Sequence, residues 1–191
     1  KTYTLIGLVK DALQRGVHPS RIGVVSFTTK AIGEFVTRSC AQFNLERKDF
    51  PHFRTLHATG YHGLGLQTTD VMGRDDYNKV GDMLGLDFYG ADFISPHDGV
   101  ILPSIGGSGS KYLQMIMRAS YRQVSLDEEY NYTDDRSLFY DKLVQIDKQL
   151  IRYKEENLKF DFCDMIKKYP ELVAPPSLDM LIVDEAQDLT P

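Results

Sequence analysis

The apolar residues of the chain follow two different periodicities. Residues 2–15 carry them at helical spacing, which predicts a helix that Gly16 ends in a left-handed conformation. Residues 21–27 and 180–183 are short continuous apolar runs that stop at polar residues, a pattern typical of fully buried strands in a parallel sheet. A further helical pattern follows residue 27, and a third, shorter strand begins at Phe53. This alternation of strands and helices predicts an α/β fold.

The middle of the chain loses this alternation. We predict helices at 75–84 and 111–124 and a loop in the acidic stretch 127–135. A long amphipathic helix then reaches about residue 157, with apolar residues four and three positions apart: Phe139, Leu143, Ile146, Leu150 and Tyr153. Basic residues on the helix at 111–124 could contact a nucleic-acid backbone, although a solvated helix face is the simpler interpretation: Lys111, Arg118 and Arg122.

These patterns predict a domain organisation with an insertion. An α/β domain is formed by residues 1–66 and 160–191, and a helical subdomain, residues 67–159, is inserted between its two parts. A chain of 191 residues is long enough for one domain and one insertion.

The candidate chemistry lies at the two ends of the chain. Asp184 and Glu185 follow the apolar run 180–183, so they should leave the sheet where open α/β folds bind ligands. A carboxylate there can hold Mg²⁺, and its neighbour can orient or deprotonate an attacking water. The alternative is an acidic turn after a core strand. Lys1-Thr2, at the head of an apolar helix, matches the end of a phosphate-binding loop, G-x-x-x-x-G-K-[ST].

Charge and cysteine content narrow the choice of function. The net charge is −5, but residues 1–60 contain nine Lys/Arg against four Asp/Glu, a local charge of +5. This part suits a phosphate backbone, whereas the overall acidity argues against a protein that coats polyanions. Cys40 and Cys163 lack zinc spacing, which favours free thiols in a reducing cytosol, and no apolar run is long enough to span a membrane. His57 and His62 are five residues apart, so we do not expect zinc.

Taken together and in order, these elements resemble the motifs of the UvrD/Rep-like superfamily 1 helicases. The similarity covers an N-terminal motor domain, and the spaced set is far more specific than any single member. The residues that carry it are Lys1-Thr2, Ser26-Phe27-Thr28-Thr29-Lys30-Ala31 with Glu34, Thr55-Leu56-His57, Phe160-Asp161-Phe162 and Val183-Asp184-Glu185-Ala186-Gln187-Asp188.

The resemblance implies a RecA-like P-loop NTPase domain that uses ATP and Mg²⁺. Lys1 would bind the phosphates, and Thr2 and Asp184 would bind Mg²⁺. Glu185 would activate the hydrolytic water, and Gln187 would sense the γ-phosphate. The glycines of the phosphate loop would precede Lys1, and a second RecA-like domain would follow residue 191, so we expect residues 1–191 alone to be inactive.

The resemblance also implies the partners. Five residues match motifs that lie along single-stranded DNA: Phe27, Thr28, Lys30, Thr55 and His57. Thr29 stands where relatives often have Asn. The substrates would be single strands and single-strand/duplex junctions, in the cytoplasm of a bacterial or phage-infected cell, with no membrane partner. Two alternatives stay open: a superfamily 2-type RNA helicase, which Asp188 and Thr55-Leu56-His57 fit poorly, and a relative that binds single strands without hydrolysis.

Overall fold

The computed structural model describes residues 2–88, 107–133 and 137–186. Within this part the chain is an α/β structure with a three-stranded sheet and eight α-helices. It forms two compact units. The first contains residues 2–65 and 168–186, and the second contains residues 66–88, 107–133 and 137–167.

The first unit is built on a parallel sheet. Its strands are β1 (Ile22–Ser26), β2 (Phe53–Thr55) and β3 (Met180–Val183), in the spatial order β2-β1-β3. Val24 of β1 pairs with Phe53 on one side and with Ile182 on the other. β3 therefore lies next to β1, although more than 150 residues separate them in the sequence.

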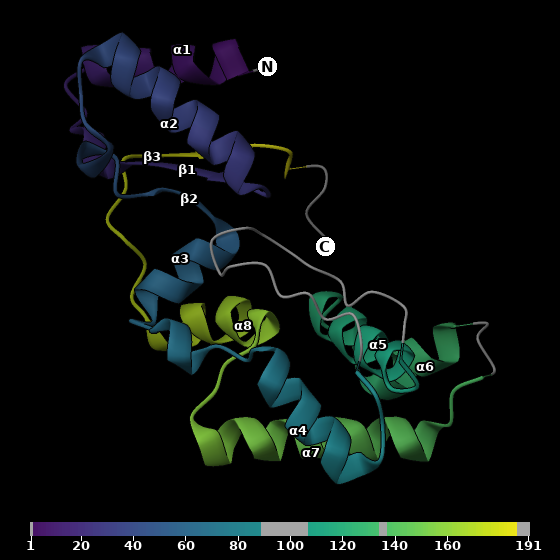
Figure 1. The fold of residues 1–191 in the computed structure, drawn as a ribbon. Coiled ribbons are helices and arrows are strands. Elements are labelled where there is room, and N and C mark those ends of the chain that lie inside the picture. The colour runs from purple at the N-terminus through teal and green to yellow at the C-terminus, as the bar shows by residue number, and fades with distance from the viewer. Residues whose placement is uncertain (1, 89–106, 134–136, 187–191) are drawn as a thin grey trace. The chain divides into compact units, whose positions relative to one another are not determined.

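Helices α1 (Thr2–Gln14) and α2 (Thr29–Phe43) lie on one side of this sheet, and α3 (Leu56–Gly63) continues from β2 on the other (Figure 1). The predicted helix at 2–15 is confirmed, and Gly16 follows it with φ 84°. Apolar side chains of α1, α2 and the sheet form one buried core: Ile6, Val9, Ala12, Ile22, Val24, Ile32, Phe35, Val36, Phe50, Phe53 and Ile182.

The prediction that residues 180–183 form a strand is confirmed, but the prediction that this strand is fully buried is wrong. Ile182 is 6% exposed, whereas Leu181 and Val183 are 56% and 38% exposed. Successive side chains of a strand point to opposite faces of the sheet. Because α1 and α2 cover only one face, Ile182 reaches the core and its two neighbours do not.

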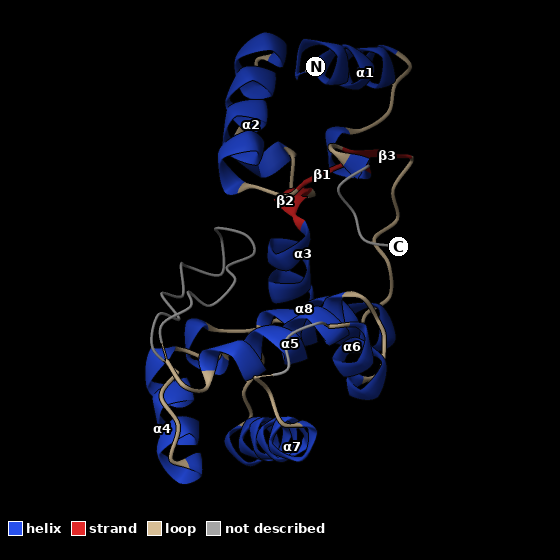
Figure 2. Cartoon of the chain, turned by 90° about the vertical axis from the view of Figure 1, so that its right-hand side faces the viewer, coloured by secondary structure: helices blue, strands red, loops and turns tan. Residues whose placement is uncertain are grey.

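The second unit is helical, and all three strands belong to the first (Figure 2). Its helices are α4 (Arg74–Leu84), α5 (Ser110–Tyr121), α6 (Leu126–Tyr132), α7 (Tyr140–Asn157) and the start of α8 (Phe162–Leu172). Its buried core is separate from that of the first unit: Met72, Tyr77, Val80, Phe88, Tyr112, Leu113, Met115, Met117, Leu138, Leu143, Ile146, Leu150 and Tyr153.

Three helix predictions in this region are confirmed by α4, α5 and α7, with α5 ending three residues early. Phe139, the first residue of the predicted apolar seam, precedes α7 and is 73% exposed, so it does not belong to the packed face. The domain boundaries at residues 66/67 and 159/160 stay a prediction.

The predicted loop at 127–135 is wrong over its described part, because residues 126–132 form α6. Its start carries a capping box: Ser125 accepts from the Glu128 amide, and the Glu128 side chain accepts from the Ser125 amide. Glu129 of α6 is 1% exposed and forms ion pairs with Arg118 and Arg122. Arg118 and Arg122 therefore pair with a buried acid while 50% and 41% of their side chains stay exposed. Their contact with a nucleic-acid backbone stays a prediction.

Candidate functional site

The carboxyl edge of the sheet brings together residues from all three strands. Ser26 ends β1, Thr55 ends β2, and Asp184 directly follows β3. The register pairs Ser26 with Thr55 and Val25 with Val183, so the C-terminal ends of the three strands lie side by side at one edge of the sheet. Side chains that leave a parallel sheet at this edge meet where α/β folds bind ligands.

Asp184 is fixed by the strand next to it. Its amide donates to the Val25 carbonyl oxygen (N–O 2.8 Å), and the Ser26 hydroxyl donates to its Oδ2 at 3.3 Å. The half-buried carboxylate thus has a hydroxyl oxygen beside it.

This donor set fits Mg²⁺. Mg²⁺ prefers oxygen ligands and commonly uses one or two carboxylates, keeping waters and substrate phosphates as its other ligands. The described residues contain no group of three or more His, Cys, Asp or Glu side chains that would enclose a metal.

Glu185 adopts an unusual backbone conformation. Its φ is 58°, in the left-handed region that few residues other than glycine adopt. This conformation costs an L-residue about 1–2 kcal/mol. It turns the chain immediately after Asp184, where β3 ends. Backbone strain of this kind is concentrated at functional sites.

The start of α1 lies toward the same end of the first unit as the carboxyl ends of β1 and β3 (Figure 1). Thr2 is the first residue of α1, and the amide groups of a first helical turn attract anions. Lys1 and Gln187, which we predicted to bind phosphate, lie outside the described residues.

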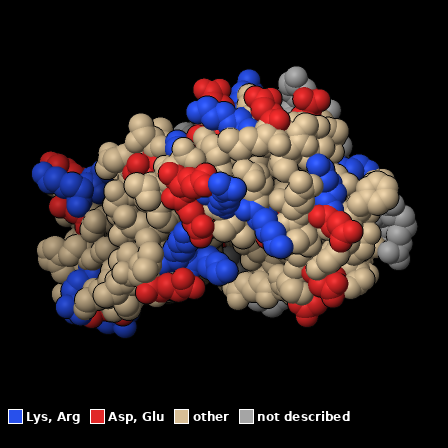
Figure 3. Space-filling view, turned by 90° about the horizontal axis from the view of Figure 1, so that it is seen from below, with Lys and Arg blue, Asp and Glu red and all other residues tan. Residues whose placement is uncertain are grey.

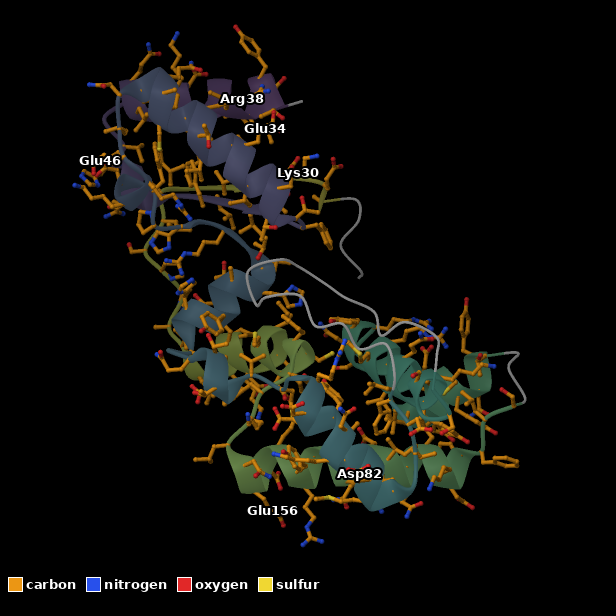
Figure 4. All side chains as sticks on the ribbon, in the orientation of Figure 1. Lys30, Glu34, Arg38, Glu46, Asp82 and Glu156 are labelled. Atoms are coloured by element: carbon orange, nitrogen blue, oxygen red, sulfur yellow. The ribbon has the colours of Figure 1, made fainter. Side chains whose placement is uncertain are left out.

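The predicted DNA-contacting residues at the start of α2 are accessible. Thr28 is the N-cap of α2, where its hydroxyl accepts from the Ala31 amide at 3.1 Å, and it remains exposed. Lys30 is exposed at the same end of the helix (Figure 4), and Phe27 is half-buried. A hydroxyl, an ammonium group and a helix N-terminus thus lie together at the edge of the sheet.

The other two predicted DNA contacts are buried. Thr55 and His57 are 2% and 5% exposed. The Thr55 hydroxyl caps α3 by accepting from the Ala58 amide at 3.1 Å. Burial lowers the pKa of His57 to about 4, so the imidazole is neutral at pH 7. In this structure Thr55 caps the start of α3, and the assignment of Thr55 and His57 to DNA binding stays a prediction.

Sequence reasoning missed a pocket of about 840 Å³ between α2 and β2. Its lining is basic as well as apolar and runs from the start of α2 to the turn before β2: Thr29, Ile32, Gly33, Val36, Thr37, Arg47, Lys48, Pro51, Phe53, Arg54, Thr55, Ala58 and His62. A sequence signal did exist, because Arg54 is a charged residue at the centre of a three-residue strand.

Two expectations from the sequence concern the cysteines and membrane-spanning segments. Cys40 and Cys163 are both free. None of the helices within the described ranges has the length and apolar character needed to cross a membrane.

The family model described as the UvrD/REP helicase N-terminal domain matches residues 1–191, the whole sequence. No curated protein sequence gives a significant match.

Proposed function

The chain belongs to the family of UvrD/REP helicase N-terminal domains, and from this membership we propose that it is the nucleotide-binding part of an ATP-dependent DNA helicase. The complete protein would couple ATP hydrolysis to movement along single-stranded DNA and to strand separation. The observation that carries the proposal is the position of Asp184, which lies beside the Ser26 hydroxyl at the carboxyl edge of the sheet and next to the left-handed Glu185.

Five residues have separate roles in the proposed hydrolytic site. Asp184 and Thr2 would hold Mg²⁺, which would supply positive charge to neutralise the phosphates. Lys1 would bind the phosphates, Glu185 would orient and deprotonate the attacking water, and Gln187 would sense the γ-phosphate and link hydrolysis to movement. Positioning and charge stabilisation supply most of the catalysis in phosphoryl transfer, so small displacements of these groups are costly.

Coupling ATP hydrolysis to movement requires contacts between the protein and the DNA. Thr28 and Lys30 are exposed at the start of α2, where a phosphate would meet a hydroxyl, a cation and the helix N-terminus. Phe27 would offer a base an aromatic face, and Thr55 and His57 would contribute through the start of α3. Translocation also needs a second RecA-like domain that closes over the nucleotide.

The catalytic assignment is tested with Glu185→Gln in the complete protein. Loss of a general base typically lowers turnover by about 10²–10⁴-fold. We expect this loss in kcat with ATP binding retained, measured by phosphate release and by titration with a fluorescent nucleotide. Asp184→Asn should instead weaken the Mg²⁺ dependence of binding.

Asp179→Asn is the matched control for these variants. Asp179 lies just before the amino end of β3 and pairs with Arg21 on the surface, with the two side chains 41% and 48% exposed. An exposed ion pair contributes about 0–1 kcal/mol, so this variant should hydrolyse ATP normally. Unchanged turnover in Glu185→Gln would remove the catalytic role of Glu185.

A further inference from the structure

The pocket between α2 and β2 contains two arginines that main-chain oxygens hold in place. Arg47 donates to the carbonyl oxygens of Phe50 and Phe53 at 2.7 and 2.9 Å. Arg54 donates from Nε to the carbonyl oxygen of Pro51 at 2.6 Å. Within the described part of the chain, neither guanidinium forms an ion pair with a carboxylate.

The charge of these two arginines is therefore uncompensated by the pocket lining. Burial lowers the pKa of Arg54, and repulsion from Arg47 lowers it further. The pKa of His52 next to them is also lowered, first by burial and then by Arg54. A cation that the fold brings close to other cations gains stability when an anion arrives.

The donor geometry suits a phosphate. A guanidinium presents five N–H donors in a planar fork. Arg54 donates to the main chain from Nε, so its two terminal amino groups can donate to another acceptor. Lys48 adds an exposed cation to the same lining, where it pairs with Glu46 at the surface.

The size and position of the pocket indicate what occupies it. About 840 Å³ is far more than a single ion requires. One end is lined by Thr29 and Thr55, directly beside the exposed Thr28 and Lys30 of the proposed DNA surface. The lining is thus continuous from that surface to the turn that carries Arg47 and Lys48, which lies beyond the other end of α2, where Figure 4 labels Glu46.

We propose that this pocket binds a phosphodiester segment of the single DNA strand, with Arg54 and Lys48 as its phosphate contacts. The proposal rests on the proposed function and adds a second stretch of contact to the one at the start of α2. The competing explanation is purely structural: Arg47 and Arg54 satisfy carbonyl oxygens around β2, the edge strand, and bind nothing else.

The test measures the affinity of the complete protein for a fluorescent oligothymidylate by anisotropy over a series of salt concentrations. Each phosphate contact on a single strand contributes about −0.7 to the slope of log K against log salt. Arg54→Gln should lower affinity about tenfold, as expected for a charged hydrogen bond, and should reduce the slope by one such increment. Arg54→Lys should keep the slope, because it keeps the charge.

Arg15→Gln is the matched control, since Arg15 is an exposed arginine whose Nε also donates to a main-chain oxygen, that of Asp11, outside the pocket. It should leave affinity and slope unchanged. Lys48→Gln tests the same pocket at an exposed position that folding does not depend on, so the inference remains testable if Arg54→Gln does not fold.

These measurements distinguish a failure of the pocket inference from a failure of the proposed function. If the complete protein binds the oligonucleotide and Arg54→Gln and Lys48→Gln keep the wild-type slope, the pocket inference is overturned and the helicase proposal stands. If the complete protein binds no single strand at all, the proposed function fails.

Discussion

Burial decides what several residues of this chain can do chemically. His57 occupies a position that the family resemblance assigns to DNA contact, yet it is 5% exposed and its pKa is lowered to about 4. A neutral imidazole cannot form an ion pair with a phosphate, so any contact from His57 would be an uncharged hydrogen bond. Thr28 remains accessible for the proposed DNA contact, because its hydroxyl caps α2 while the side chain stays exposed.

The lowered pKa of His57 predicts a loss of stability in acid. Below pH 6.5 the His57 side chain is protonated in the unfolded chain, whereas in the folded chain it stays neutral until the pH falls to about 4. Stability therefore falls as the pH falls through this window, by up to about 3 kcal/mol. In urea titrations from pH 7 to pH 4, His57→Gln should lose less unfolding free energy than the wild type. His18→Gln, at an exposed histidine, should follow the wild type, and parallel profiles for all three proteins would contradict the prediction.

A largely buried ion-pair cluster lies between the end of α7 and the start of α8. Lys154, near the end of α7, donates to Asp161 at 2.7 Å and lies 2.8 Å from Asp164. All three side chains are at most 20% exposed. Burial acts to lower the pKa of Lys154, but the two carboxylates outweigh it and raise the pKa on balance. Burial and the charge of Asp161 also raise the pKa of Cys163 to about 12, so this thiol is inert at neutral pH.

Removing one member of this cluster should be strongly destabilising. Lys154→Met leaves two buried carboxylates without their cation, and breaking a buried pair costs about 3–5 kcal/mol. Arg152→Met is the matched control on the same helix, because Arg152 pairs with Glu156 on the surface, where such a pair contributes about 0.3–0.5 kcal/mol. Urea unfolding compares the two variants, and adding Asp161→Asn and Asp164→Asn should recover part of the loss. Equal destabilisation by the two single substitutions would show that the cluster has no special energetic role.

At the scale of the whole molecule, the charges are unevenly distributed along the sequence but mixed on the face that Figure 3 shows. Residues 1–60 carry a net charge of +5, whereas the protein as a whole carries −5. Figure 3 shows acidic and basic side chains interspersed on the face seen from below. A strand of nucleic acid would therefore be held locally, in the basic first part of the chain, and not by a general field.

Deoxyribose and ribose strands present the same phosphate charge, so the preference between them depends on the sugar. We expect single-stranded DNA to stimulate ATP turnover of the complete protein well above an RNA of the same sequence and length. Phosphate release at equal nucleotide concentration measures both, with duplex DNA as the control. Equal or stronger stimulation by RNA would favour an RNA helicase over a DNA helicase.

The sequence by itself determined most of the elements and their order. Helical spacing predicted α1, α2, α4, α5 and α7, and short apolar runs that stop at polar residues predicted the strands, because such patterns are local properties of the chain. Family membership likewise followed from motif residues and their spacing. The capping box of α6 is also readable in the sequence, but the acidic composition of that stretch favours a loop and so conceals the helix.

Only the tertiary structure decided which surfaces are covered and which residues meet. It placed β3 beside β1, left Leu181 and Val183 exposed, and buried His57. It also set Arg47 and Arg54 in one pocket without a carboxylate. Burial, pKa and charge compensation depend on neighbours that come from distant parts of the chain, and a local pattern of residues does not specify those neighbours.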